Sequence, residues 1–224
     1  MSNKRKRIGK GLKAPDLPLQ RLEKIALNDV VEDNGSYVQA VLSRNDLSGQ
    51  RLHHFALDQV LLEHVELSKT YIDPIRVLDS RFKACDLANA EWVKADFARV
   101  ELLDCLLTGF QANEARFQDM LLKNCVGHFA QFAQTTFEVV RFEECDLSDA
   151  NFFEADLSGA LFLNCDLSNA DFTGAKLAGA DLRGSKIDGM RVGPRELQGA
   201  TLDPTQALAF VRGLGIIVAS PSPQ

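Results

Sequence analysis

The sequence predicts an all-β solenoid with four sides, followed by a short α-helix, and three observations lead to this prediction. Between Ala40 and Pro204 an apolar residue returns at every fifth position. A cysteine also returns at every twentieth position, and a helix-like stretch follows at residues 204–213. A period of five fits neither an α-helix of 3.6 residues per turn nor a strand that alternates every two residues. Five-residue sides and twenty-residue coils account for both spacings.

The large apolar residues of this repeat run from Leu42 to Leu202, and only Ala112 and Gly127 interrupt them. A second inward column lies two positions earlier and consists mostly of alanine and cysteine, including Cys85, Cys105, Cys125, Cys145 and Cys165. Phe110 reverses the order with Ala112, an exchange of volume that a packed core tolerates. Gly127 has no such compensation, so we expect a local kink or bulge there. Residues 40–204 would form roughly eight coils about 4.8 Å apart.

The composition limits what kind of protein this is. With 224 residues, the chain is long enough for one solenoid with terminal segments rather than two globular domains. No apolar run approaches the roughly 18 residues of a membrane span, and no leader sequence is visible. We therefore expect a soluble, cytoplasmic protein. The five cysteines lack CxxC-like pairs, which favours reduced, buried thiols over disulfides or a zinc site.

The formal charge of −6 is distributed unevenly along the chain. Residues 1–39 carry 8 basic and 5 acidic side chains, whereas residues 40–204 carry 16 basic and 26 acidic ones. The solenoid is therefore the acidic part. An acidic surface of this kind repels nucleic acid and membranes and attracts basic partners, so we expect neither direct nucleic-acid binding nor membrane binding.

The segments outside the repeat have separate predictions. Residues 1–14 contain the basic run KRKR and few apolar side chains, which predicts a disordered basic tail. Residues 15–39 are expected to form an N-terminal cap over the open first coil, with a tight turn at Asn34-Gly35. Residues 205–219 are expected to form a helix and a strand, and residues 220–224 to be disordered.

Several repeat units carry a recognisable pattern: CDLSD (145–149), ANFFE (150–154), ADLSG (155–159), CDLSN (165–169), ADFTG (170–174) and ADLRG (180–184). These units resemble the pentapeptide-repeat family, whose pattern is A(D/N)Lxx. The resemblance covers about three quarters of the chain. It implies a right-handed quadrilateral β-helix in which the central residue and the residue two before it point inward.

The C-terminal segment has its own signals. Asp203 is the predicted N-cap, Pro204 lies in the first turn, and Gly213 ends the helix. Ile216–Val218 could pair as a strand. The arrangement GATLDPTQALAFVRGLGIIV (199–218) resembles the C-terminal module of Qnr and MfpA-like proteins, pentapeptide-repeat proteins that bind type II topoisomerases. In that group the helix makes a two-fold dimer; a cap without a partner is the alternative. The residues assigned to dimerisation are Leu208, Phe210, Val211 and Leu214.

The sequence offers no candidate for catalysis, so we predict a protein that is not an enzyme. No phosphate-binding loop, dinucleotide glycine pattern or nucleophile elbow is present. The repeat places His53 and His54 on one side of the coil and His64 on the opposite side, with His128 alone. We therefore predict no catalytic residues, no metal and no cofactor.

Two surfaces are candidates for binding a partner. On the side that holds the cysteines, Asp46, Glu66 and Asp86 are expected to stack one per coil; Leu106 and Val126 interrupt the column, and Asp146 and Asp166 resume it before Lys186. The acidic site predicted from these patterns comprises Asp86, Asp146, Asp156 and Asp166. The resemblance to Qnr and MfpA-like proteins implies DNA mimicry toward DNA gyrase or topoisomerase IV, with protection from inhibitors such as quinolones. The alternative is a structural scaffold with an unknown partner, bound through the apolar residues Phe129, Phe153 and Leu163.

Overall fold

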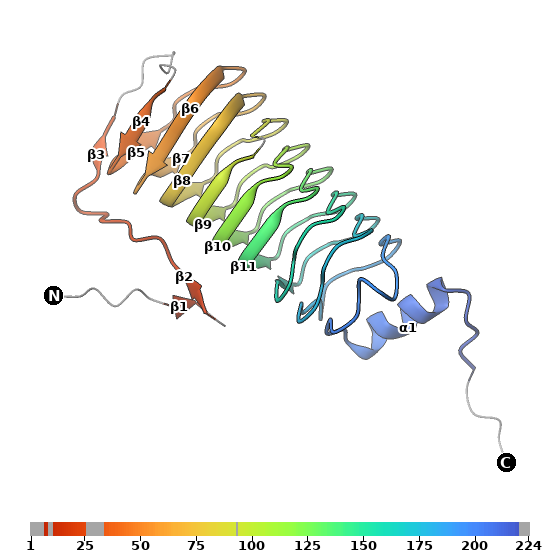
Figure 1. Ribbon diagram of the computed structural model, residues 1–224. Helices are drawn as coiled ribbons and strands as arrows, with labels where there is room; N and C mark the ends of the chain where they lie inside the picture. Colours follow the sequence, from red (N-terminus) through yellow and green to blue (C-terminus); the bar gives the residue numbers. More distant parts are fainter. Residues whose placement is uncertain (1–6, 9–10, 26–33, 93, 220–224) are drawn as a thin grey trace.

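The computed structural model describes residues 7–8, 11–25, 34–92 and 94–219, and it confirms the predicted solenoid (Figure 1). The chain forms a β-solenoid of about seven turns that ends in one helix, α1 (Pro204–Gly213). The strands are β1 (Arg7–Ile8), β2 (Leu12–Lys13), β3 (Glu23–Lys24), β4 (Ser36–Val38), β5 (Ala40–Ser43), β6 (Arg51–Asp58), β7 (Leu61–Glu63), β8 (Tyr71–Lys83), β9 (Asp96–Leu103), β10 (Arg116–Lys123), β11 (Thr136–Glu143) and β12 (Leu161–Leu163).

The strands of the solenoid pair in parallel, and each coil lies in register with the next. Phe117 of β10 is paired with Phe97 of β9 and with Phe137 of β11, a step of twenty residues in each direction. Isolated bridges continue the same step outside the strands, for example from Asp146 to Asp166. The twenty-residue coil predicted from the cysteine spacing is therefore the structural repeat.

Two inward columns per side fill the interior, as predicted. All five cysteines are buried, and the large central residues from Leu42 to Leu182 are almost all buried as well. Phenylalanine rings stack from coil to coil: the centroids of Phe142 and Phe162 lie 4.7 Å apart, and those of Phe152 and Phe172 lie 4.8 Å apart. This spacing equals the separation of neighbouring strands, so identical residues in successive coils are held in van der Waals contact.

The two interruptions of the repeat have different outcomes. Phe110 and Ala112 are both buried, so the exchanged pair fills the core as predicted. The kink or bulge expected at Gly127 is wrong, because the bridges from Leu106 through Val126 to Asp146 continue without a break. A Cβ atom on Gly127 would lie 2.9 Å from Cδ2 of Leu147, which shows that the neighbouring leucine fills the space. The compensating residue is therefore in the next coil.

The N-terminal segment differs from the predictions. Residues 11–22 follow one corner of the solenoid from the middle coils back to its start, where β3 pairs with β5 (Figure 1). The prediction of a disordered tail is wrong for residues 11–14, because Leu12 is buried and Lys13 is bound to Asp119. Within the predicted cap, β3 pairs with β5 and β4 pairs with β6, whereas Asp16 contacts the corner of the middle coils. Residues 7–8 form β1, which pairs with β2, so the prediction fails there too, whereas residues 1–6, 9–10, 26–33 and 220–224 lie outside the described residues.

The C-terminal helix begins and ends where the sequence predicted. Asp203 is its N-cap and accepts hydrogen bonds from the backbone N–H groups of Thr205 and Gln206, while the Gln206 side chain accepts one from Asp203 N. Gln206 also donates to the carbonyls of Leu182 (2.6 Å) and Ser185 (2.7 Å), which fixes the helix to the last regular coil. Ile216–Val218 do not form the predicted strand.

The solenoid has about seven turns rather than the roughly eight predicted. The last coil loses its regular shape after Arg191, where residues 194–199 form turns instead of a flat side. Glu196 accepts hydrogen bonds there from the N–H groups of Gly174 and Gly193. The Glu196 carboxylate thus takes the place of the backbone carbonyl that pairs with the equivalent N–H one coil earlier, where Glu154 N donates to Thr173 O.

Candidate functional site

The side of the solenoid whose inner column holds the cysteines is called the cysteine face here. Its outward column is connected from coil to coil by parallel bridges, in the order that the sequence predicted: Asp46, Glu66, Asp86, Leu106, Val126, Asp146, Asp166 and Lys186. Each residue directly precedes the inward central residue of its side, so the pleat turns it outward. The face therefore has two acidic ends and an apolar middle.

The carboxylates of this column are held in fixed positions by the turn that follows each of them. The Oδ1 atom of Asp86 accepts a hydrogen bond from Ala88 N, and those of Asp146 and Asp166 accept one from the backbone N–H of the serine two residues later. Nζ of Lys186 lies 2.9 Å from Oδ2 of Asp166. Burial alone would raise the pKa of Asp166, but the hydrogen bonds from Ser168 and Lys186 lower it below its ordinary value. Asp166 therefore remains ionised, and Lys186 in the following coil offsets part of its charge.

Asp156, the fourth residue of the predicted acidic site, does not lie with the other three. Ten residues, half a coil, separate it from both Asp146 and Asp166, so it faces the opposite side of the solenoid. Its bridges join Thr136 and Lys176, and its Oδ2 lies 3.1 Å from Nζ of Lys176. Three of the four predicted acidic residues therefore share a face, and one does not.

The three residues of the predicted apolar patch, Phe129, Phe153 and Leu163, also lie on different sides of the solenoid. Phe129 is 52% exposed at the corner next to the cysteine face, and Phe153 is exposed one coil further on the adjoining side. Leu163 is only half-buried and lies half a coil away from Phe153, on the opposite side. The structure instead groups Phe129 with Leu106 and Val126, which are exposed on the cysteine face. The rings of Phe129 and His128 lie 3.8 Å apart at their centroids.

The C-terminal end presents a second apolar surface. A cavity of about 280 Å³ lies between α1 and the last coils, and its lining includes Ile187, Met190, Phe210 and Leu214. Of the residues assigned to dimerisation, Leu208, Phe210 and Val211 are half-buried and Leu214 is exposed. Beyond the helix, Ile216, Ile217 and Val218 are exposed, Ile217 to 92%. An apolar surface of this kind at the end of a solenoid fits an interface.

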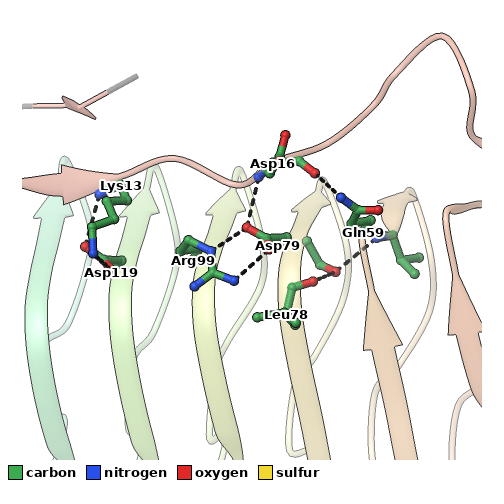
Figure 2. A network of polar contacts seen from close by, with 9 residues as sticks. Lys13, Asp16, Gln59, Leu78, Asp79, Arg99 and Asp119 are labelled. Atoms are coloured by element: carbon green, nitrogen blue, oxygen red, sulfur yellow. Dashed lines mark hydrogen bonds and ion pairs between the residues drawn. The ribbon is translucent and has the colours of Figure 1, made fainter. Parts of the chain in front are cut away.

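The sequence analysis missed a polar corner that the N-terminal segment covers (Figure 2). Gln59, Asp79, Arg99 and Asp119 occupy equivalent corner positions in four successive coils, twenty residues apart. Arg99 donates to both carboxylate oxygens of Asp79, at 2.6 and 2.7 Å, and these hydrogen bonds raise the pKa of Arg99. The sequence does show four polar residues at the twenty-residue spacing of the coil. Polar residues at this spacing are exposed elsewhere in the solenoid, so the spacing alone did not predict a covered corner.

Within residues 7–8, 11–25, 34–92 and 94–219, no group of three or more His, Cys, Asp or Glu side chains is arranged to hold a metal ion. The single helix of this part of the chain is too short to cross a bilayer.

Comparisons with known proteins agree with the repeat seen in the structure. Residues 75–152 match the family model described as pentapeptide repeat region, and residues 150–189 match the model described as pentapeptide repeats (8 copies). No curated protein matches the chain.

Solved structures of two named proteins illustrate the likeness. Full-length QnrB1, a plasmid-mediated fluoroquinolone resistance protein, is 20% identical, with a TM-score of 0.48 over 81% of this chain and 100% of that one. HetL from Nostoc sp. strain PCC 7120, a pentapeptide-repeat protein involved in heterocyst differentiation regulation, is 21% identical, with a TM-score of 0.29 over 76% of this chain and 90% of that one. Since the two repeat models together span 75–189, half of the 224 residues, the chain belongs to the pentapeptide-repeat family.

Proposed function

We propose that this pentapeptide-repeat protein is a non-enzymatic DNA mimic that binds a type II topoisomerase, such as DNA gyrase or topoisomerase IV, and protects it from inhibitors such as quinolones. The observation that carries the proposal is the column of the cysteine face, where Asp46, Glu66 and Asp86 precede an apolar centre and Asp146 and Asp166 follow it. The resemblance of residues 199–218 to the C-terminal module of Qnr and MfpA-like proteins supports the choice of partner.

The geometry of the face suits a basic, DNA-binding surface. Carboxylates in successive coils are about 4.8 Å apart, so they form a linear array of negative charge along a narrow rod. Proteins that bind duplex DNA neutralise a linear array of phosphates with lysine and arginine. The exposed Leu106 and Val126 would supply the apolar centre of an interface with a charged rim.

A two-fold dimer would double the length of this array. The exposed Leu214, Ile216 and Ile217 at the C-terminal end offer an apolar surface for a second copy. A dimer through α1 would leave the cysteine face of each copy exposed, because that face runs along the rod and α1 lies at its end (Figure 1). Deletion of 205–218 should therefore yield monomers in sedimentation or light scattering; a dimer that survives the deletion would place the interface elsewhere.

The direct test is a DNA-gyrase supercoiling assay with and without a quinolone, with the protein added over a salt series. We expect an effect at micromolar protein that weakens as salt rises, because attraction between exposed charges is screened. No effect at that concentration, or binding that salt does not weaken, would exclude the proposal.

The structure supplies a matched pair of variants for the same assay. Asp166 and Asp156 each pair with a lysine in the following coil, at 2.9 and 3.1 Å, but they lie on opposite faces. Asp166→Lys should therefore weaken the interaction at least about tenfold, a loss of roughly 1.4 kcal/mol. Asp156→Lys should have little effect. Equal losses from both variants would mean that net charge, rather than the cysteine face, determines binding.

The second candidate function is a scaffold that binds a partner through apolar contact, and the exposed Val126 and Phe129 favour it. Val126→Ser with Phe129→Ser should then abolish the capture of that partner from a lysate, while Asp166→Lys should leave it unchanged. The DNA mimic instead predicts a large loss from Asp166→Lys, so that variant separates the two candidates.

A further inference from the structure

We infer that the corner formed by Gln59, Asp79, Arg99 and Asp119 is a binding site for extended basic peptides, and that residues 11–18 of the chain itself occupy it (Figure 2). We call residues 11–18 the strap. The inference concerns a different surface from the cysteine face and does not depend on the proposed topoisomerase partner.

The corner contacts the strap mainly through its backbone. Asp119 accepts a hydrogen bond from Lys13 N (3.1 Å), and Asp79 accepts one from Asp16 N (3.0 Å). Gln59 donates to the carbonyl oxygen of Asp16 (2.8 Å). Hydrogen bonds to N–H and C=O groups recognise an extended backbone without selecting a particular side chain, as in the strand-addition mode of peptide binding.

The spacing of the corner residues matches that of an extended chain. Asp79 and Asp119 are two coils apart, or about 9.6 Å at the usual strand separation. Lys13 and Asp16 are three residues apart, or about 10 Å in an extended strand. The separation of the two carboxylates therefore matches the separation of the two N–H groups that they bind.

With the strap in place, the carboxylates of this site are oriented and largely buried. Only 7% of the Asp79 side chain and 4% of the Asp119 side chain are exposed. Arg99 holds Asp79 through two hydrogen bonds, which leaves its Oδ1 directed toward Asp16 N. Asp119 also lies 3.6 Å from Nζ of Lys13, so the site favours a basic residue at that position.

The strap contributes little to the core, which makes it exchangeable. Of residues 11–18 only Leu12 is buried; Gly11 is exposed and the rest are half-buried. Pro15 and Pro18 favour an extended backbone. They also have no N–H group, so neither position needs a hydrogen-bond acceptor on the corner. A segment with one buried apolar side chain opens at a lower free energy than the interlocked coils beside it.

The test uses the full-length protein and a fluorescein-labelled peptide of residues 7–22, followed by fluorescence anisotropy. The wild-type protein should bind the peptide weakly, because its own strap competes at an effective concentration of the order of millimolar. The full-length variant Lys13→Pro with Asp16→Pro lacks the two N–H donors of the strap. It should bind the wild-type peptide at least about tenfold more tightly than the wild-type protein does.

Two controls define specificity. A peptide with the same two prolines should bind neither protein. Adding Asp119→Gly to the strap variant should abolish binding, whereas Glu144→Gly should not, since both positions have left-handed backbone (φ 53° and 54°) but Glu144 lies on another corner. Equal binding of the peptide to the wild type and the strap variant, or binding that Asp119→Gly leaves unchanged, would overturn the inference.

Hydrogen exchange tests the same contacts in the unmodified chain. The amide protons of Lys13 and Asp16 should exchange at least about a hundredfold more slowly than in the free peptide, because both are hydrogen-bonded to buried carboxylates. Asp119→Gly should remove the protection of Lys13. Exchange of both amides in the wild-type protein at the rate of the free peptide would show that the corner does not hold the strap.

Discussion

The early coils, residues 40–124, and the late coils, residues 140–185, share one backbone repeat but differ at one corner. In the early coils this corner carries Gln59, Asp79, Arg99 and Asp119, whereas the next positions of the same column are Val139, Gly159 and Gly179. The strap follows the early corner and reaches no further than the coils next to Asp119. The corner residues, rather than the inner core, therefore decide where an external segment can bind.

The interiors differ as well. The late coils contain stacked phenylalanines with alanine or cysteine between them, whereas the early coils place larger residues such as Phe55, Val60 and Ile75 in the second column. Outside, the late coils carry exposed acid–base pairs such as Asp166 with Lys186, and the early coils carry the buried pair Asp79 with Arg99. Both regions share one buried apolar core, and the early coils add a buried polar corner to it.

The largest expected effect is that of Phe152→Ala in the late coils. Phe152 is fully buried and its ring contacts those of Phe132 and Phe172 at 5.3 and 4.8 Å. Its removal should lower the free energy of unfolding by about 4 kcal/mol, because the neighbouring stacked rings cannot collapse into the space. Urea denaturation followed by circular dichroism measures the loss. A loss below about 1 kcal/mol would contradict rigid packing of the late coils.

Trp92, the single tryptophan of the chain, is buried in the early coils, so its fluorescence reports the unfolding of that region separately from the late coils. In a solenoid each coil contacts only its neighbours, so Phe152→Ala should destabilise the late coils first. The circular dichroism of Phe152→Ala should therefore begin to change at a lower urea concentration than its tryptophan fluorescence. Coincident transitions would mean that the two regions unfold as one unit.

The second prediction concerns the early corner. Arg99→Met leaves Asp79 charged in a site where only 7% of its side chain is exposed, which should cost about 3 kcal/mol. Asp79→Asn combined with Arg99→Met removes both charges and should recover much of that loss. Urea denaturation followed by Trp92 fluorescence measures both variants. A double variant as unstable as Arg99→Met would show that packing, not the unpaired charge, is responsible.

A third, smaller effect is expected at the C-terminal end, outside both regions. Gln206→Ala removes the two hydrogen bonds to the buried carbonyls of Leu182 and Ser185 and should cost about 2 kcal/mol. Asp203→Ala, which removes the N-cap and one weaker contact with Gly184 N of the solenoid, should cost about 1 kcal/mol and serves as the comparison. If Gln206→Ala costs no more than Asp203→Ala, the helix is not held by that side chain.

The smallest effect is the dependence of the late coils on pH and salt. Burial would raise the pKa values of Asp166 and Asp171, but hydrogen bonds and neighbouring cations lower both below the ordinary value of 3.8. A carboxylate with a lowered pKa in the folded state contributes stability above pH 3.8, and this contribution is lost as the pH falls through the folded pKa.

Each of these partly exposed pairs should contribute less than about 1 kcal/mol. Asp166→Asn should reduce the loss of stability between pH 5 and pH 2, and 1 M salt should lower the stability at pH 7 by a similarly small amount, both measured by thermal denaturation. The buried pair of the early corner should respond less to salt. A pH profile that Asp166→Asn leaves unchanged would assign acid sensitivity to other carboxylates.

Much of this molecule was predictable because it is a repeat. A period of five and a cysteine at every twentieth residue predicted the coil, the inward columns and the order of residues along the cysteine face. The prediction nevertheless grouped Asp156 and Leu163 with residues that lie half a coil away from them. That error came from combining residues by type, although counting from the cysteine column would have separated them.

The sequence by itself determined the parallel coil, the buried cysteines and the ends of α1, because each follows from contacts between residues at a fixed spacing or within one turn. Only the tertiary structure decided the position of the strap, the compensation of Gly127 by Leu147 and the docking of α1 through Gln206. The hydrogen bond from Lys13 to Asp119 spans 106 residues and follows no period. Contacts of that kind depend on which surfaces meet after the solenoid has formed, and no local pattern encodes them.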